Sequence, residues 1–310
     1  MFEKIALIGI GLIGSSIARA IREQKLAPHV AISTRSQVTL DKAEELGLGD
    51  SYSVDPTVVV QDADLVIICA PVGAYEAIGK AIASHLKPGA IVSDVGSVKE
   101  HVVKALQPHL PDNVHFIPGH PISGTENSGP EAGFASLFEG KWCILTPVEG
   151  TDQTALDKLT ALWRAFGSDV EIMDAKHHDM VLAITSHVPH LIAYNIVGTA
   201  DHLESVTKSE VIKFSAGGFR DFTRIAASDP VMWRDVFLTN KEAVMEMLGR
   251  FSEDLSMLQR AVRFGDGEML EELFTRTRNI RRSIIDAGQE TDAPDFGRHV
   301  STPEEAEKEA

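Results

Sequence analysis

The sequence predicts an α/β fold in its first half and an all-helical fold in its second half. In the first half, short apolar runs typical of buried strands alternate with helical patterns, and the first run leads into a glycine-rich turn. From Asp174 onward the pattern is helical, with almost no strand signal. We therefore expect a sheet domain over residues 1–173, a helical domain over 174–288 and an acidic, disordered tail over 289–310.

The glycine-rich turn predicts a dinucleotide-binding domain of the Rossmann type. Lys4–Ile8 is typical of a first strand, Gly9-Ile10-Gly11-Leu12-Ile13-Gly14 follows it, and an alanine-rich helical pattern begins at Ser15. A G-x-G-x-x-G segment between a strand and a helix lets a pyrophosphate rest on free N–H groups at the helix N-terminus. The expected cofactor contacts in this turn are Gly9, Gly11, Leu12, Ile13 and Gly14.

The choice between NAD and NADP depends on the end of the second predicted strand, His29–Ser33. An acidic residue there would hold the adenosine ribose, but Thr34-Arg35-Ser36 stands in its place. The missing carboxylate removes repulsion of a 2′-phosphate, and Arg35 with the hydroxyls of Thr34 and Ser36 offers it ligands. The cofactor is therefore NAD or NADP, and the sequence favours NADP unless Arg35 stacks on adenine or faces solvent.

His120 is the candidate general base. It follows the apolar run at residues 115–118, so we expect it at the end of a buried strand, where ligands bind in open α/β sheets. A histidine there exchanges a proton near neutral pH, although a loop histidine can also simply cap a carbonyl. Ser97 follows another predicted strand, residues 90–95, and forms a capping box with Glu100, so helix capping and catalysis both remain open for it. The other predicted strands of this half are residues 64–70, 141–146 and 170–173, with helices at about 74–86 and 152–166.

The first helix of the second half, about residues 175–199, is interrupted by Ser186-His187-Val188-Pro189-His190. Proline removes a backbone hydrogen bond and kinks a helix, which suggests a site. His187 and His190 share a helix face, but no carboxylate or cysteine completes a metal ligand set, so we expect no metal. We interpret the polar residues at the helix start as capping and solvent-facing groups: Asp174, His177, His178 and Asp179.

Arg224 is the candidate carboxylate clamp, because a planar guanidinium binds a carboxylate through two hydrogen bonds. It ends the segment Gly217–Arg224, and an intrahelical pair with Asp221 is the structural alternative. Two long helices follow, at about 230–264 and 268–287, joined at Gly265-Asp266-Gly267. Their apolar stripe exceeds what a monomer needs and predicts a homodimer interface. The stripe consists of Val236, Val244, Leu248, Phe251, Leu255, Leu258 and Val262.

Charge and composition limit the partners and the location. The net charge of −16 argues against nucleic acid or an anionic membrane surface, which bind basic proteins. No apolar run approaches the ~20 residues that cross a bilayer, and no signal-peptide pattern is visible. Cys69 and Cys143 lie in apolar runs and are expected to be buried, reduced thiols. The sequence therefore predicts a cytoplasmic protein.

Four ordered motifs resemble those of the prephenate/arogenate (cyclohexadienyl) dehydrogenases, over about Lys4 to Ala287. They are Gly96-Ser97-Val98-Lys99, His120-Pro121-Ile122-Ser123-Gly124-Thr125-Glu126, Ser186-His187-Val188-Pro189-His190 and Gly218-Phe219-Arg220-Asp221-Phe222-Thr223-Arg224. The resemblance implies an oxidoreductase of tyrosine biosynthesis that decarboxylates prephenate or arogenate and transfers a hydride to NAD(P). The acidic residue common after the family's second strand is absent here.

The resemblance also implies roles for individual residues. Neutral His120 would accept the proton of the ring 4-hydroxyl, oriented by Ser97. Arg224, positioned by Asp221, would hold the ring carboxylate. His190, with His187, would hold the side chain. Thr125 and Glu126 would line the pocket, and Lys99 is a weaker candidate.

Two other functions remain open from the residues. A 3-hydroxyacid-type dehydrogenase would use a lysine base, and Lys241 beside Asn240 is the nearest candidate, without that family's glycine-rich helix pattern. A non-catalytic nicotinamide-binding sensor would keep the glycine turn but has no use for His120, Arg224 and a kinked two-histidine helix. The sequence does not decide between prephenate and arogenate, or whether tyrosine inhibits.

Overall fold

The computed structural model describes residues 2–125, 127–202 and 216–286. Its contacts divide the chain into two compact units, Met1–Met247 and Leu248–Ala310, which are treated one at a time below. Glu126 and the acidic tail expected over residues 289–310 lie outside the described residues. The domain boundary expected between residues 173 and 174 stays a prediction.

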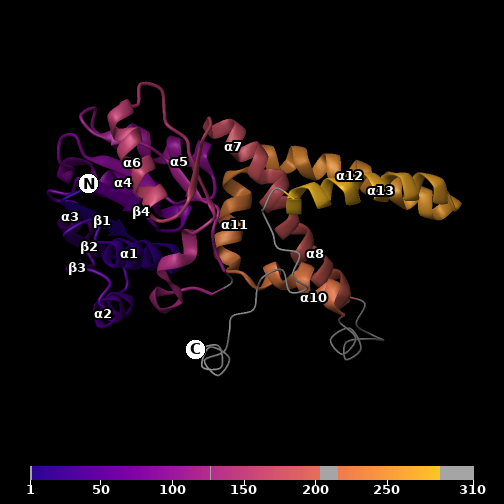
Figure 1. Cartoon of the computed structure of the whole chain (residues 1–310), viewed down its shortest axis with the longest axis horizontal. Helices are drawn as coiled ribbons and strands as arrows, with labels where there is room; N and C mark the ends of the chain where they lie inside the picture. Colours follow the sequence, from indigo (N-terminus) through magenta and orange to yellow (C-terminus); the bar gives the residue numbers. More distant parts are fainter. Residues whose placement is uncertain (1, 126, 203–215, 287–310) are drawn as a thin grey trace. The chain divides into compact units, whose positions relative to one another are not determined.

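The first unit is built on a parallel sheet with strand order β3-β2-β1-β4-β5-β6 (Figure 1). This confirms the expected α/β fold. The order reverses between β1 and β4, so ligands are expected in the crevice at the carboxyl ends of these two strands. The strands are β1 Lys4–Ile8, β2 His29–Ser33, β3 Ser51–Ser53, β4 Leu65–Ile68, β5 Ile91–Asp94 and β6 His115–Phe116.

Helices cover both faces of this sheet, and its strands are accordingly apolar on both sides. Along β1, Ile5 and Leu7 belong to one buried cluster, whereas Ala6 and Ile8 belong to a second cluster on the opposite face. The helices of this part are α1 Leu12–Gln24, α2 Gln37–Glu45, α3 Pro56–Val59, α4 Tyr75–Ile82, α5 Lys99–Leu106 and α6 Gln153–Ala165. Short helical turns are η1 Val72–Ala74, η2 Ala83–His85, η3 Gln107–His109, η4 Pro130–Ala132 and η5 Ala135–Phe138.

His120 follows the end of β6, as expected, and itself lies inside a short strand of a second sheet. Strand β7, Gly119–Pro121, pairs antiparallel with β8, Trp142–Leu145, and β8 pairs parallel with β9, Asp169–Ile172. The change of partner occurs at Pro118, which has no N–H for the first sheet and whose carbonyl accepts from the Thr146 amide at 2.9 Å. Pairing with β8 therefore fixes the main chain both before and after His120.

The interrupted helix expected near Pro189 is a continuous helical run with a π-helical turn in it. The run consists of α7 Ala175–Leu182, the π-helical turn η6 Ala183–His187 and α8 Val188–His202. Pro189 falls in the first turn of α8, directly after the π-helical turn. Single π-helical turns accommodate a missing backbone hydrogen bond and are frequent at functional sites.

This same run, Ala175–His202, is the one helix among the described residues that is long and apolar enough to cross a bilayer by length and composition. The sequence expectation that no run approaches this length was therefore too strict. The observation is weak evidence for a membrane span, because core helices of globular proteins pass the same test. The run carries His178, Asp179 and His187, whose side chains are buried within the first unit.

One long helix was expected over residues 230–264, and the structure divides it at Asn240. Helix α11, Pro230–Thr239, ends there, and α12, Lys241–Phe264, begins directly afterwards. Asn240 leaves the helical conformation, with φ −104° and ψ 34°, and its buried side chain makes tertiary hydrogen bonds. Before it lie α10, Gly217–Thr223, and the short turn η7, Arg224–Ala227.

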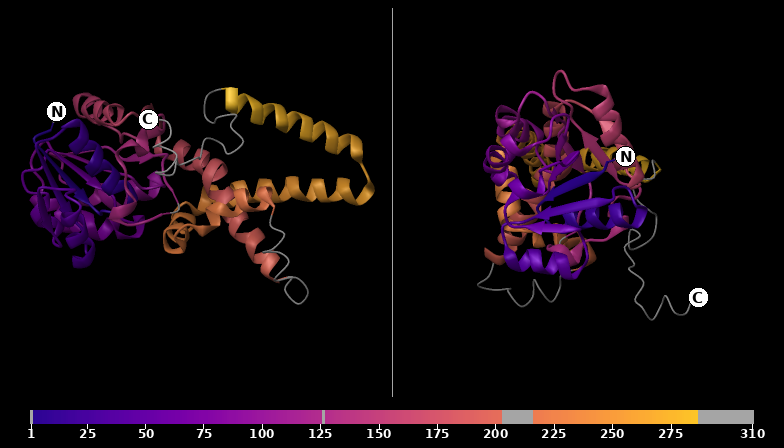
Figure 2. Two further views of the ribbon diagram at one scale, coloured as in Figure 1. Left: turned by 60° about the horizontal axis from the view of Figure 1, so that its bottom comes forward. Right: turned by 90° about the vertical axis from the view of Figure 1, so that its left-hand side faces the viewer.

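The second unit contains the end of α12 and α13, Gly267–Asp286, joined at Gly265 as the sequence predicts. Figure 2 shows α13 turning back from α12. Large apolar side chains remain exposed on both helices, among them Val262 at 68% and Phe274 at 56%. Val236 and Val244, the first two members of the expected stripe, are instead buried in the first unit, so only the later members contribute to an uncovered surface.

Candidate active site

The turn between β1 and α1 has the backbone geometry that a dinucleotide site requires. Gly9 has a φ of +101°, and a Cβ atom on it would lie 2.6 Å from the carbonyl carbon of Cys69 at the end of β4. A Cβ atom on Gly14 would clash with the carbonyl oxygen of Gly9. Around Gly11, by contrast, no atom would lie within 4 Å of a Cβ atom. The turn therefore leaves open space at Gly11, beside the N–H groups of Leu12, Ile13 and Gly14 at the start of α1.

Thr34, Arg35 and Ser36 lie directly after β2, in the position where a ribose is bound in this fold. Ser36 is the N-cap of α2 and accepts a hydrogen bond from the Thr39 amide at 3.3 Å. Arg35 is exposed and makes no ion pair with any of the described residues. Its guanidinium is thus free for a 2′-phosphate, while the Ser36 hydroxyl already has a structural role.

His120 is part of a buried chain of three side chains. Its Nδ1 lies 2.8 Å from Nε2 of His178, and Nδ1 of His178 lies 2.8 Å from Oδ1 of Asp179. The sequence interpretation of His178 and Asp179 as capping and solvent-facing groups was wrong, since the two are 0% and 2% exposed. Asp174 does cap α7, by accepting from the His177 amide. The helix therefore turns its acidic start outward and the next pair, His178 and Asp179, inward.

The hydrogen-bond chain determines which nitrogen of His120 carries the proton. Both carboxylate oxygens of Asp179 accept from main-chain N–H groups, at 2.7 and 2.9 Å, so Asp179 acts as an acceptor and His178 donates to it from Nδ1. The remaining nitrogen of neutral His178, Nε2, must then accept from His120. It follows that His120 is protonated on Nδ1 and that its Nε2 is an unprotonated acceptor, as a general base requires.

His120 is also held in its neutral form. Burial lowers its pKa well below the ordinary 6.5, and positive charge on His178, Lys99 or His187 acts in the same direction. The pKa of His178 is lowered by burial as well, although Asp179 opposes that shift. Both imidazole rings are therefore neutral at neutral pH, so the hydrogen-bonded side chains of His120, His178 and Asp179 can accept a proton.

Asp179 has a second contact that changes the interpretation of Ser97. Its two oxygens accept from the amides of Lys99 and Glu100 and so cap the N-terminus of α5. The capping box expected from Ser97 and Glu100 is absent: the N-cap residue is Val98, and no side chain of the adjacent segment caps the helix. Since Ser97 has no capping role, the structural alternative for Ser97 no longer applies.

His187 is a further buried side chain, close to His178 and Asp179. Its ring is 0% exposed, and its Nδ1 accepts from the Asn240 side-chain amide at 3.1 Å, so its proton is on Nε2. Burial lowers its pKa to about 4, and the Ser97 main chain opposes that shift. Asn240 also donates to the Asp179 carbonyl at 2.9 Å. Asn240 therefore joins the His187 ring to the main chain of α7, while Nε2 of His187 is buried without a hydrogen-bond partner among the described residues.

His190 and Arg224 lie near one another. The His190 ring stacks on Trp233 at 3.6 Å between centroids and donates from Nδ1 to the Ser186 carbonyl at 2.9 Å. Burial lowers its pKa, and the charge of Arg224 lowers it further. Neutral His190 thus presents Nε2 as an acceptor, and Arg224 is the better placed of the two for an anion.

Three other expected site residues are less well determined. Thr125 is exposed, and its hydroxyl accepts from the Asn127 amide at 3.2 Å. Glu126 lies outside the described residues. Asp221 is exposed on α10, three residues before Arg224. Lys241, the base of the alternative dehydrogenase, is exposed at the start of α12.

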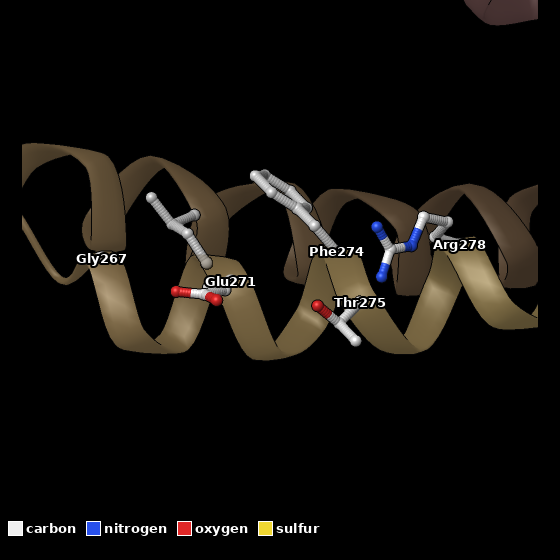
Figure 3. A pocket seen from close by; sticks show the side chains of 6 residues that line it. Gly267, Glu271, Phe274, Thr275 and Arg278 are labelled. Carbon is white, nitrogen blue, oxygen red and sulfur yellow. The ribbon is translucent and has the colours of Figure 1, made fainter.

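Two surface hollows are lined by other residues. One of about 420 Å³ runs along α13 and is lined by Leu270, Glu271, Phe274 and Arg278 among others (Figure 3). A second of about 400 Å³ lies between α1 and the segment around Phe134, next to Arg19 and Arg22. No group of three or more metal-ligating side chains occurs in the part of the chain that the structure describes. The absence of a metal stays a prediction.

Comparison with known proteins assigns the chain to a family. Two family models match in succession: the prephenate dehydrogenase nucleotide-binding domain over residues 17–172 and the prephenate dehydrogenase dimerization domain over residues 174–276. The chain belongs to the prephenate dehydrogenase family. The family resemblance expected from the four sequence motifs is confirmed, and with it the Rossmann-type domain followed by a helical domain.

Relatives of known name and structure extend over nearly the whole chain. The cyclohexadienyl dehydrogenase of Zymomonas mobilis is 42% identical over 92% of this chain and 97% of its own length. The prephenate dehydrogenase of Bacillus subtilis is 34% identical over 92% of this chain and 76% of its own. The crystal structure of the Aquifex aeolicus prephenate dehydrogenase with hydroxyphenyl propionate and NAD+ is 35% identical, with a TM-score of 0.83, over 92% of this chain and 99% of that one. All three relatives are named as dehydrogenases, two of them as prephenate dehydrogenases.

Sequence reasoning missed four buried residues of the site: His178, Asp179, Asn240 and Asp94. The last binds Lys99 through a buried ion pair with Nζ and Oδ2 2.6 Å apart. A signal was present for two of them, because a His-Asp pair on the helix that carries the Ser186–His190 motif is typical of a hydrogen-bonded base. For Asn240 and Asp94, the patterns of a long helix and of a buried strand concealed the polar side chain.

Proposed function

We propose that this chain catalyses the oxidative decarboxylation of prephenate, arogenate or both, with NAD(P) as the hydride acceptor and His120 as the general base. The named relatives support the reaction class. The observation that carries the residue assignment is the chain His120–His178–Asp179, because it leaves Nε2 of a neutral, buried His120 as an acceptor. The product is the hydroxyphenyl compound of tyrosine biosynthesis.

In this mechanism the protein moves one proton. When bound, the oxidised nicotinamide accepts the hydride from the ring carbon that bears the 4-hydroxyl group. His120 takes the hydroxyl proton on Nε2 as the C–O bond becomes a carbonyl. Cleavage of the ring carbon–carboxylate bond then releases CO₂ and leaves a phenolate, which takes the proton back from His120 to give the phenol. The positive charge that develops on His120 is shared through His178 with Asp179. Substrate and NAD(P)+ thus give the phenol, CO₂ and NAD(P)H.

The remaining residues orient the substrate. Ser97, whose hydroxyl has no capping role, orients the 4-hydroxyl group or the His120 ring. Arg224 holds the ring carboxylate through a bidentate pair, with Asp221 beside it. His190 reads the side chain through Nε2, and Thr125 with Glu126 lines the pocket. His187, which is 0% exposed, supports the site through its hydrogen bond with Asn240 rather than by contact with the substrate as the sequence suggested.

We propose that the preferred cofactor is NADP rather than NAD. The exposed guanidinium of Arg35 and the hydroxyl of Thr34 follow β2, where no carboxylate repels a 2′-phosphate. For the assembly, we propose a homodimer through the exposed apolar side chains of α12 and α13, in keeping with the family name of this region. A cytoplasmic location, the lack of nucleic-acid or membrane partners, and a domain boundary near residue 173 remain predictions.

The test is a matrix of four assays, in which prephenate and arogenate are each combined with NAD and with NADP. For at least one substrate we expect the absorbance of the reduced cofactor to increase and CO₂ to be released. The KM for NADP should be lower than that for NAD. Arg35→Ala should raise the KM for NADP and leave that for NAD within about twofold. No turnover in any of the four assays, with the folded protein still binding cofactor, would favour a nicotinamide-binding sensor.

A further inference from the structure

Gly119, the residue before His120, is held on both of its main-chain polar groups by two buried side chains. Its N–H donates to Oδ1 of Asp94 at 3.1 Å, and its carbonyl accepts from Nζ of Lys99 at 2.6 Å. Asp94 and Lys99 are themselves joined at 2.6 Å, and both are 0% exposed. Asp94 ends β5 and Lys99 begins α5, so the pair connects the first sheet to the strand that carries His120.

The surroundings of Gly119 are tight. A Cβ atom there would lie 3.0 Å from the Asp94 carbonyl oxygen and 3.2 Å from Cδ2 of Leu145, so a side chain would require these neighbours to shift by a few tenths of an ångström. Strand β7 therefore approaches the end of β5 closely, and glycine fits this distance without such a shift. The close approach is what lets one carboxylate and one ammonium reach both sides of a single residue.

Asp94 is fully engaged in this arrangement. Its Oδ2 accepts from the Gly96 amide at 2.7 Å and from Lys99, and the Tyr75 hydroxyl lies 3.4 Å away. Neither Asp94 nor Lys99 is exposed to a substrate, so neither is a catalytic residue. A buried ion pair of this kind contributes little net stability compared with apolar residues of the same volume, which suggests a different reason for its presence.

We propose that Asp94 and Lys99 are positioning residues. Their hydrogen bonds to the N–H and the carbonyl of Gly119 fix the orientation of the His120 ring relative to His178 and to the substrate. The proposal rests on His120 being the base. The same pair also determines the electrostatic surroundings of the ring. Positive charge on Lys99 opposes protonation of His120, as does charge on His178 or His187, the other titratable groups that face it. Lys99 opposes protonation of His178 as well, while Asp94 favours it.

The test removes both charges together, because a single replacement would leave an unpaired buried charge and unfold the protein. In Asp94→Asn/Lys99→Met we expect kcat to fall about 10-fold to 100-fold, with the KM for the substrate and the Kd for the cofactor within about twofold of wild type. The acid limb of the kcat–pH profile should move to higher pH, since the charge of Lys99 no longer disfavours protonation of His120. Lys87→Met is the control, because it breaks the pair between Lys87 and Asp64, the residue directly before β4. This change should leave kcat and its pH profile unchanged.

The outcomes separate this proposal from the function on which it rests. The positioning role would be overturned if the folded double variant had the kcat and the acid limb of wild type. If His120→Asn were inactive at the same time, the base assignment would still stand. Turnover by His120→Asn would instead overturn the base assignment. Should the double variant melt below the assay temperature, the same measurements are made at a lower temperature at which circular dichroism shows that it is folded. An unchanged kcat and pH profile there would equally contradict the proposal.

Discussion

The Nδ1 atom of His120, on β7, lies 2.8 Å from Nε2 of His178, on α7. These two residues are 58 positions apart in the sequence, and both are buried. Since Asp179 fixes the proton of His178 on Nδ1, this contact requires the proton of His120 to be on Nδ1 too. The tautomer of the proposed base is thus determined from the helical part of the chain.

Asp179→Asn should lower kcat by about 10²-fold or more. An amide in place of the carboxylate can donate to His178 Nδ1 and so permits the wrong tautomer, and it no longer balances the charge that develops on His120. The measurement is steady-state kinetics together with the tautomer of His120 from imidazole ¹⁵N shifts. Asp174→Asn is the matched control, because it makes the same change at the N-cap of α7, the helix that carries Asp179, without touching the hydrogen-bond chain. Equal kcat in the two variants would contradict the role of Asp179.

Arg224→Ala should raise the KM for prephenate by about 10-fold or more, with a smaller effect on kcat. The expected size follows from the loss of a charge-assisted hydrogen bond, worth about 1.5–3 kcal/mol. Arg220→Ala, on the exposed side of α10, provides the control and should leave the KM unchanged. An unaltered KM in Arg224→Ala would remove its clamp role.

The pH dependence of kcat follows from the lowered pKa of His120. Its neutral form is the active one, and burial lowers its pKa well below 6.5. Activity should therefore be constant through neutral pH and decline only well below pH 6.5, as the ring takes up a proton. A decline that begins above pH 6.5 would show that another group controls the rate.

The stability of the fold should decrease over the same acidic range. Burial lowers the pKa values of His120, His178, His187 and His190, that of His187 to about 4. For His187, between pH 6.5 and about 4, the unfolded chain binds a proton that the folded chain does not, so the free energy of unfolding falls as the pH falls. Each unit of lowered pKa contributes about 1.4 kcal/mol to this loss. Urea unfolding at a series of pH values measures it, and His187→Gln should reduce the slope.

The dimer proposal predicts that a charge on α13 separates the chains. Phe274→Glu should shift the mass measured by light scattering towards that of one chain, because it places a carboxylate in an apolar surface. Val38→Glu replaces an even more exposed apolar side chain on α2, at 79%, and should leave the mass unchanged. A dimeric Phe274→Glu protein would place the interface elsewhere.

Local sequence patterns predicted the sheet domain well, because strand, turn and helix signals there lie within a few residues of one another. The turn Gly9–Gly14 and the break at Gly265 are examples. They failed where a distant residue took over a local role. Ser97 and Glu100 have the spacing of a capping box, yet Asp179, 80 residues away from Lys99, caps α5 instead. Asn240 lies in an unbroken helical pattern, and only its tertiary partners, Asp179 and His187, explain why the helix ends there.

The most direct test of the base assignment is His120→Asn, assayed for turnover and cofactor binding in parallel. Asparagine keeps a side chain of similar polarity at the same place but cannot accept the hydroxyl proton. The predicted result is a kcat at least ~10²-fold below wild type with an unchanged Kd for the cofactor. A His120→Asn protein that turns over prephenate or arogenate at the wild-type rate would contradict the account.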